Sequence, residues 1–152
     1  MKKISEFKGI KGNLNALKEA VGGCKKIAYA GVPGVCTPFA QLFAYALRDK
    51  DNIFIPNTDV KKARKLILTS YGVELGEKVE AKADALVLLG GLAMPKIGVD
   101  VEEVKKLINN VLTEEGKIIG ACFMDVFRKA GWHKEINFDC IIDAVIKGSV
   151  LK

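Results

Sequence analysis

Residues 27–47 read IAYAGVPGVCTPFAQLFAYAL and contain no charged side chain. An uncharged run of this length is long enough to cross a bilayer as one helix. Two glycines and two prolines interrupt its middle, however, so we expect an apolar strand over 27–30, a loop over 31–38 and an apolar helix over 39–47. The stretch therefore predicts a buried strand followed by a helix, and no membrane span.

The same alternation continues on both sides of this stretch. Further apolar strands are predicted at 52–56, 85–89 and 117–123, and amphipathic helical stripes at 10–21, 60–67 and 104–112. Residues 125–130 fit a turn or two of helix, and residues 73–79 fit a short extended piece. The segment 138–150 fits either a helix or one face of a strand, and its β-branched residues favour the strand.

Strands that alternate with helices form a mostly parallel sheet with helices on both faces. We therefore predict one α/β domain over residues 1–152, a three-layer α/β/α fold of the Rossmann-like or flavodoxin-like kind, with about five strands. A chain of 152 residues, of which 49% are hydrophobic, is long and apolar enough to bury such a core without disulfides or a structural metal. The same composition excludes a disordered chain.

The net charge of +6 comes from 24 Lys and Arg residues against 18 Asp and Glu residues. Only Arg48, Arg64 and Arg128 are arginines, and the lysines are scattered without a basic stripe interleaved with aromatic residues. We therefore interpret the charge as a solvated surface and expect no nucleic-acid partner. The four cysteines form no C-x-x-C pair and no signal peptide is visible, which favours free thiols in a reducing cytoplasm.

Ligands bind to parallel sheets at the carboxyl ends of the strands, near the point where the strand order reverses. Four segments are predicted to reach this edge: 31–38, 57–59, 90–96 and 122–125. The first of these loops leads directly into a helix, and the N–H groups at a helix N-terminus attract phosphate or carboxylate. We therefore predict that a small anionic ligand, either a nucleotide or a phosphorylated metabolite, binds at this edge.

The candidate ligand-binding residues all lie in these loops. They are Gly31, Gly34, Val35, Cys36, Thr37, Asn57, Gly90, Gly91, Lys96 and Asp125. Backbone amides after Gly34 would hold the anion and Lys96 would add positive charge. The glycine spacing matches neither G-x-G-x-x-G nor the P-loop, so the sequence identifies no cofactor, and no metal site is predicted. In the plainer alternative the glycines and prolines only turn the chain, and Asp59 and Asp125 only cap helices.

Cys36 supports a second hypothesis, that of an enzyme with a nucleophilic or redox thiol. It lies just before a helix, whose dipole is expected to lower the pKa of the thiol. Cys122 is predicted at the same edge, so a Cys36–Cys122 pair, together with the sole histidine His133, could bind a metal or cycle between redox states. Against both ideas, free cysteines commonly serve as small buried apolar residues, and nothing in the sequence places His133 beside Cys36.

The predicted helix over 39–47 is apolar around nearly its whole circumference. Such a helix is either sandwiched within the fold or placed in a subunit interface, and we predict a homodimer that uses it. A third functional hypothesis follows, that of a non-catalytic interaction subunit which docks through Phe39–Leu47.

Four segments together resemble a known family: GVPGVCTPF at 31–39, FIPNTD at 54–59, LLGGLAMPK at 88–96 and CFMD at 122–125. The family is a small group of conserved archaeal proteins, mostly from methanogens, with a domain of unknown function and a Rossmann-like fold. The resemblance covers most of the chain. It implies an α/β architecture and an archaeal cytoplasm, and it carries no functional residues over to this sequence.

Overall fold

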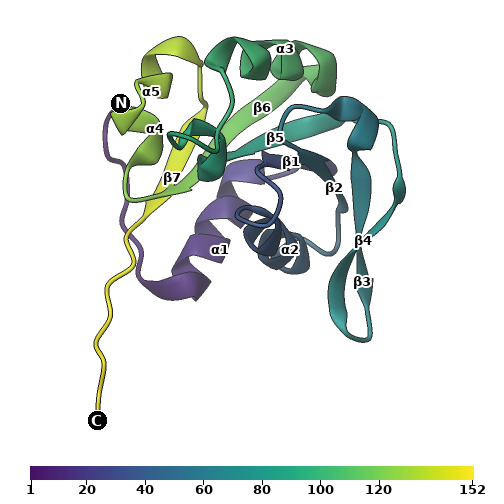
Figure 1. Ribbon diagram of the computed structural model, residues 1–152. Coiled ribbons are helices and arrows are strands. Elements are labelled where there is room, and N and C mark those ends of the chain that lie inside the picture. Colours follow the sequence, from purple (N-terminus) through teal and green to yellow (C-terminus); the bar gives the residue numbers. More distant parts are fainter.

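Seven strands form one sheet in the order β4-β3-β2-β1-β5-β6-β7, and the computed structural model describes all of residues 1–152 (Figure 1). The strands are β1 (Lys26–Gly31), β2 (Asp51–Pro56), β3 (Arg64–Thr69), β4 (Gly72–Lys78), β5 (Ala83–Leu89), β6 (Leu112–Phe123) and β7 (Cys140–Ala144). The helices are α1 (Gly9–Val21), α2 (Thr37–Ala46), α3 (Val101–Val111), α4 (Val126–Lys129) and α5 (Trp132–Glu135), with the 3-10 turns η1 (Val60–Lys62) and η2 (Gly90–Ala93).

Five of the strands are parallel to one another. β1 pairs with β2 on one side and with β5 on the other, and β6 and β7 continue the parallel order. In the central register Ala28 lies opposite both Ile53 and Leu86. The antiparallel strands β3 and β4 extend the sheet beyond β2. The α/β class is therefore confirmed, whereas the estimate of five strands is wrong, because the β3–β4 hairpin makes a mixed sheet of seven.

The helix predicted at 60–67 is mostly a strand. Only one 3-10 turn forms, in which the Lys61 N–H donates to the Asp59 carboxylate at 3.1 Å, and the chain then enters β3. The apolar spacing in this segment imitates a helix, but Leu66 is buried opposite Asn52 of β2. The open edge of β2 supplies hydrogen-bond partners for the backbone N–H and C=O groups of this segment when the segment is extended. Pairing with β2 therefore outweighs the helical pattern of the local sequence.

The preference for a strand in 138–150 is confirmed for part of that segment. β7 pairs with β6 from the Ile119–Cys140 pair to the Phe123–Ala144 pair. The chain then leaves the sheet, and residues 145–152 have no regular structure.

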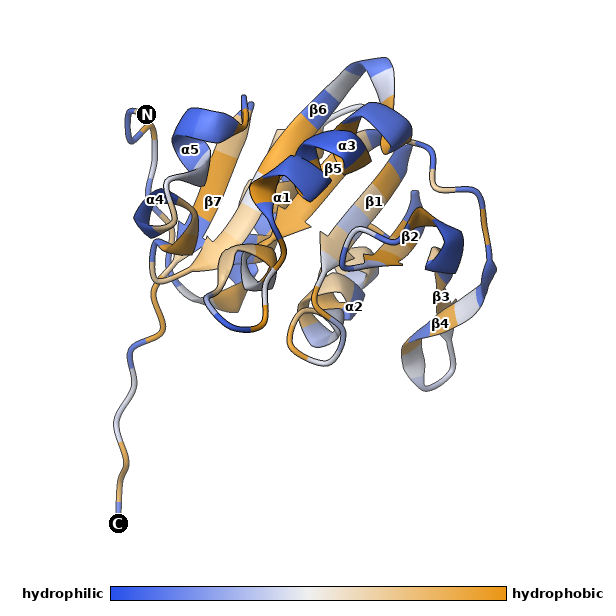
Figure 2. Cartoon of the chain, turned by 45° about the horizontal axis from the view of Figure 1, so that its top comes forward, coloured by the Kyte–Doolittle hydropathy of each residue, from blue (hydrophilic) through white to orange (hydrophobic).

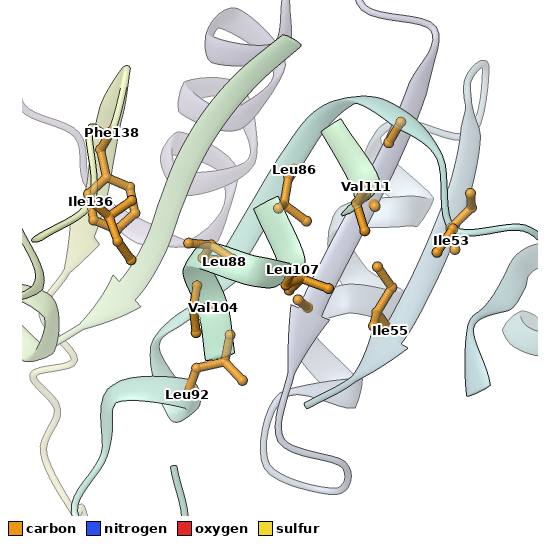
Figure 3. Packing of buried hydrophobic residues seen from close by; sticks show 14 of the residues in the cluster. Ile53, Ile55, Leu86, Leu88, Leu92, Val104, Leu107, Val111, Ile136 and Phe138 are labelled. Atoms are coloured by element: carbon orange, nitrogen blue, oxygen red, sulfur yellow. The ribbon is translucent and has the colours of Figure 1, made fainter. Parts of the chain in front are cut away.

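Two apolar clusters cover the two faces of the parallel strands. On one face α1 and α2 pack against the sheet, with Phe43 stacked on Tyr29 at 6.3 Å between ring centroids. On the other face Leu107 of α3 packs near Leu86 and Leu88 of β5 (Figure 3). The orange bands along β1, β5 and β6 in Figure 2 mark these buried strands. No residue of β3 or β4 belongs to the cluster under α3, so the three-layer prediction holds only for the parallel part of the sheet.

The apolar circumference of α2 is explained by packing within the chain. The helix lies on the sheet and contacts α1 on one side and β4 on the other. Within its span only Pro38 and Tyr45 are exposed. The homodimer through this helix therefore stays a prediction, and the helix does not require one. None of the helices is long and apolar enough to cross a membrane.

One polar pair lies inside the core next to α2. The Tyr29 hydroxyl donates to Asn52 Oδ1 at 2.9 Å, and the Asn52 amide donates to the carbonyls of Leu47 at 2.9 Å and Lys50 at 3.0 Å. Burial raises the pKa of Tyr29 above its usual range, so the hydroxyl stays protonated. Asn52 thus ties β1, β2 and the end of α2 together.

We expect Asn52→Ala to lower the free energy of unfolding by about 2–4 kcal/mol, because it leaves a buried hydroxyl and two carbonyls without partners. Tyr29→Phe should cost about 1–2 kcal/mol, since only one acceptor is then left unpaired. Urea denaturation of the purified variants measures both. The control is Asn109→Ala on the exposed side of α3, and an Asn52→Ala variant as stable as this control would contradict the role given to the pair.

Candidate functional site

The strand order reverses at β1, and this places a crevice at the carboxyl ends of β1 and β5. From β1 the chain crosses to β2 on one side, and later returns to β5 on the other side. The strands β1 and β5 are neighbours, and the loop after β1 and the η2 turn after β5 therefore lead away from each other. This is the position at which open α/β sheets bind ligands.

A pocket of about 400 Å³ lies at this place and is called here the switch-point pocket. It is lined by Val35, Cys36, Phe39, Phe43, Leu89, Gly90, Gly91, Met94, Pro95, Ala121, Phe123, Met124, Val126 and Lys129. Ten of these 14 residues are hydrophobic, and the rings of Phe39 and Phe123 are 4.8 Å apart between centroids. Lys129 is the only charged residue in the lining. The pocket lies at the edge of the sheet at which the sequence predicts a ligand site, and its lining is mainly apolar.

Four of the ten predicted ligand-binding residues line the pocket: Val35, Cys36, Gly90 and Gly91. Gly31 lies behind them, against Cys36. The other five do not line the pocket: Gly34, Thr37, Asn57, Lys96 and Asp125.

Local contacts explain several of the five. The Gly34 N–H donates to Thr37 Oγ1 at 3.1 Å, and the Cys36 N–H donates to the Val32 carbonyl at 2.8 Å, so these amides are already paired. Asn57, in a left-handed conformation with φ of 54°, donates its N–H to the Gly31 carbonyl at 2.7 Å. These groups hold the loop in shape and do not point at an open anion site.

The apolar lining escaped the sequence analysis. The sequence places Phe39 and Phe43 on the apolar helix over 39–47, and Met94, Phe123 and Met124 in the segments 90–96 and 122–125, without marking any of the five as a site residue. The available signal was the concentration of large apolar side chains just after three predicted strands, where polar loop residues are usual. Nothing in the sequence marks Lys129 as a site residue, because its position in the pocket lining depends on the short helix α4.

The glycines at this edge serve close packing against two cysteines. A Cβ on Gly31 would lie 2.4 Å from Cys36 Cβ, and a Cβ on Gly91 would lie 2.5 Å from Cys36 Sγ. A Cβ on Gly90 would likewise lie 2.7 Å from Cys122 Cβ. Both cysteines are buried, with 3% and 4% exposure. The glycines therefore let the two side chains fit between the strand ends.

Burial sets the chemistry of Cys36. It raises the pKa of the thiol above its ordinary value, against a smaller lowering effect of the backbone of Val32 and Gly91. The prediction of a lowered pKa at Cys36 is therefore wrong, because removal of the thiol from water outweighs the backbone hydrogen bonds that favour the thiolate. A neutral, enclosed thiol behaves as a small apolar residue.

Cys122 belongs to a hydrogen-bonded turn beside the pocket. Its thiol donates to Asp143 Oδ1 at 3.4 Å, and the same oxygen accepts the Asp125 N–H at 2.8 Å. Burial raises the pKa of Cys122 to about 12, and the charge of Asp143 acts in the same direction. Met124 and Asp125 both have positive φ, 57° and 63°, so these bonds hold a tight turn from β6 into α4.

Asp125 and His133 lie outside the pocket lining. The Arg128 side chain donates two hydrogen bonds to the Asp125 carboxylate, at 2.7 and 3.0 Å, and this partner holds the pKa of Asp125 below its usual value. Nδ1 of His133 is buried without a hydrogen-bond partner. No three His, Cys, Asp or Glu side chains gather into a set that could hold a metal ion.

The chain matches the family model of an uncharacterized protein conserved in archaea (DUF2124) over residues 8–147. An uncharacterized protein of Methanothermobacter thermautotrophicus is 60% identical over 152 residues, which cover 100% of this chain and 99% of that protein. An uncharacterized protein of Methanocaldococcus jannaschii is 44% identical over 153 residues, which cover 99% and 94% of the two chains. A crystal structure of a protein of unknown function from M. thermautotrophicus, 60% identical, superposes with a TM-score of 0.98 over 100% of this chain and 98% of its own. The resemblance to archaeal proteins of methanogens is confirmed.

The contact between Gly91 and Cys36 predicts a rescue. Gly91→Ala should lower the free energy of unfolding by about 1–3 kcal/mol, because the added methyl group meets the sulfur. In the double variant Gly91→Ala/Cys36→Ala the sulfur is gone, so the loss should be smaller than the sum of the two single losses, by about 0.5 kcal/mol or more. Urea denaturation of the four forms measures this coupling. Gly23→Ala is the control, since nothing lies within 4 Å of its added methyl group, and strictly additive losses would contradict the packing role.

The buried thiols predict an order of alkylation. In the native protein at mildly alkaline pH, iodoacetamide should modify the partly exposed Cys24 and Cys140 before Cys36 and Cys122. Burial raises the pKa of all four thiols, so the order follows from the enclosure of Cys36 and Cys122, which keeps the reagent away from the sulfur. Mass spectrometry of digests gives the rate at each cysteine, and the urea-unfolded chain, in which the four rates should converge, is the control. A Cys36 that reacts first in the native protein would revive the thiol-enzyme hypothesis.

Proposed function

The chain belongs to the DUF2124 family of proteins conserved in archaea, and we propose that it binds a small ligand with an apolar or aromatic body and one anionic group in the switch-point pocket. The observation that carries this proposal is the pocket itself, an apolar cavity of about 400 Å³ at the reversal of strand order, with a single lysine in its lining.

The apolar walls are suited to a flat ring. The ring centroids of Phe39 and Phe123 are 4.8 Å apart, and Met94 and Met124 add flexible thioether side chains to the lining. Aromatic and methionine side chains adapt well to planar apolar groups and gain free energy when the ligand displaces water. Small concave sites with these walls and few polar groups are typical of small-molecule binding.

One feature supports an anionic group at the edge of the ligand. Lys129 brings one positive charge to the lining, and it is the one charged side chain there. The ε-ammonium group can donate hydrogen bonds to a phosphate or a carboxylate. One cation suits a single phosphate or carboxylate better than a polyphosphate. Among the nucleotides and phosphorylated metabolites expected from the sequence, we therefore propose monophosphates with an apolar or ring-shaped body as ligands. Aromatic carboxylates have the same combination of an apolar body and one negative charge, and they belong to the proposed ligand class as well.

A catalytic role for Cys36 has no support in the geometry, because the thiol is enclosed and its pKa is raised. The cytoplasmic location belongs to the same proposal, since four free cysteines suit a reducing compartment.

The test is a thermal-shift screen with purine and pyrimidine monophosphates, the matching triphosphates, aromatic carboxylates and inorganic phosphate. A ligand at about 100 times its Kd adds about 2.7 kcal/mol, which raises the Tm of a domain of this size by roughly 5–10 °C. Monophosphates or aromatic carboxylates should produce the shift, and inorganic phosphate should not, because it has no apolar body. A flat response to every compound would overturn the proposal.

The role of Lys129 is tested with its charge removed. Lys129→Gln should weaken the identified ligand by about tenfold, measured by calorimetric titration, because the charge-assisted hydrogen bond is lost. The matched control is Lys134→Gln, which removes an exposed lysine of the neighbouring α5 outside the pocket lining. Equal affinities in the two variants would show that the anionic group lies elsewhere.

A further inference from the structure

We propose that the switch-point pocket holds a plain aromatic hydrocarbon ring in its interior, while a short aliphatic linker and one carboxylate or phosphate group of the same ligand remain at its mouth. The ligands are then arylalkyl carboxylates and phosphates, and nucleotides are excluded. This ligand class rests on the proposed function and selects within it, because a nucleobase carries polar atoms around its edge and a hydrocarbon ring carries none.

The residues that line the switch-point pocket differ in their exposure to solvent. Six of them are buried and are called here the floor: Cys36, Phe43, Leu89, Gly90, Gly91 and Ala121. Five are exposed and are called the mouth: Val35, Met94, Pro95, Met124 and Lys129. The remaining three, Phe39, Phe123 and Val126, are half-buried. A bound ligand therefore meets two different environments along its length.

The floor offers no side-chain nitrogen or oxygen to a ligand. Its one polar side-chain group is the thiol of Cys36, which is a weak donor and is packed so closely that a Cβ on Gly91 would lie 2.5 Å from the sulfur. The backbone of Cys36 is paired, since its N–H donates to the Val32 carbonyl at 2.8 Å and its carbonyl accepts the Ala40 N–H at 3.0 Å. The Gly91 carbonyl accepts the Met94 N–H at 3.2 Å. These groups are therefore already bonded within the chain.

The other floor residues belong to regular structure. Leu89 and Ala121 lie opposite each other in the parallel pairing of β5 with β6. Phe43 lies within α2, and its carbonyl accepts the Leu47 N–H at 3.0 Å. Gly90 is the first residue of the η2 turn. Strands and helices bond their own backbone groups, so the floor presents mainly carbon atoms to the cavity.

This floor distinguishes rings by their polar atoms. A nucleobase has ring nitrogens together with amino or carbonyl groups, and in the floor each of them would lose its water without gaining a partner. One such unpaired group weakens binding by about tenfold. A hydrocarbon ring loses no hydrogen bonds on entry, and it gains aromatic contacts with Phe43 and with the Phe39–Phe123 pair. The floor therefore favours the ring without polar substituents.

The charge of the ligand stays at the mouth. An anionic group in the floor would be removed from water with no cation or donor beside it, which is very costly. At the mouth it keeps part of its hydration and can accept hydrogen bonds from the exposed Lys129. The other mouth side chains, such as Val35, Met94 and Met124, are aliphatic or thioether groups. A short aliphatic linker between ring and anion matches them, and the ligand enters ring first.

Calorimetric titration with matched compounds tests this ligand class. Phenylacetate and benzyl phosphate should each bind at least tenfold more tightly than the para-hydroxy analogue of the same compound, and more tightly than AMP or UMP. The two compounds differ only in the anionic group, so they also compare carboxylate with phosphate. A nucleoside monophosphate that binds more tightly than both would overturn the ligand class and leave the proposed function in place. No binding by any of these compounds would overturn both.

A hydroxyl introduced into the floor should relax the selection. Cys36→Ser adds a donor and acceptor at nearly unchanged size, so the preference for phenylacetate over para-hydroxyphenylacetate should fall at least threefold. Cys24→Ser, a partly buried cysteine outside the lining, is the matched control and should keep the full preference. Ala121→Ser provides the same test from β6 where the Cys36 variant is unfolded by circular dichroism. An unchanged preference in the folded floor variants would contradict selection by the floor.

A neutral probe tests the floor without any anionic group. Benzene at millimolar concentration should shift the NMR signals of the Leu89 and Ala121 methyl groups, because an apolar cavity without polar partners takes up hydrocarbons. The methyl signals of Leu68, which is exposed on β3 outside the lining, should stay in place. Unchanged signals at Leu89 and Ala121 would overturn the role of the floor, even where an anionic ligand is found. Shifts with benzene beside a flat thermal-shift screen would uphold the apolar floor and overturn the anionic group of the proposed function.

Discussion

The structure depends on the burial of β1 on both of its faces. Ile27, Ala28, Tyr29 and Ala30 have no exposed surface, and such a strand must have a hydrogen-bonded neighbour on each side and a helical layer above and below. The chain meets this condition by sending β2 to one side of β1 and β5 to the other. The loops after β1 and β5 therefore separate, and the crevice between them is a direct consequence of the way in which the central strand is buried.

The same constraint decides what lines the crevice. The strand ends approach closely, and Gly31, Gly90 and Gly91 leave the room that Cys36 and Cys122 occupy. The cysteines thereby lose contact with water, and their thiols remain neutral. The remaining space is bordered by phenylalanine and methionine side chains from α2, η2 and the end of β6. Loop composition alone suggests a phosphate site at this edge of the sheet. In the structure, the same edge carries an apolar pocket with one basic residue in its lining.

The sequence analysis succeeded where a local pattern and the tertiary environment agree. The strand at 85–89 is a continuous apolar run and is buried on both faces, as expected for a central parallel strand. It failed at 60–67, where helical spacing lies next to the unpaired edge of β2. For the site, the edge of the sheet followed from the order of elements. The individual contacts did not, since the Asn57 N–H is bonded to the Gly31 carbonyl of β1 and Thr37 Oγ1 accepts from the Gly34 N–H.

The amino-acid sequence by itself determined the alternation of strands and helices, the burial of the central strands and the edge of the sheet at which the loops after the parallel strands gather, because these follow from hydrophobic periodicity and from the handedness of parallel connections. Only the tertiary structure decided the hairpin at the sheet edge, the neutral state of the thiols, the apolar walls of the pocket and the exposed path of residues 145–152. Each of these depends on which residues distant in the chain become neighbours, and burial and pairing between such neighbours outweigh local preference.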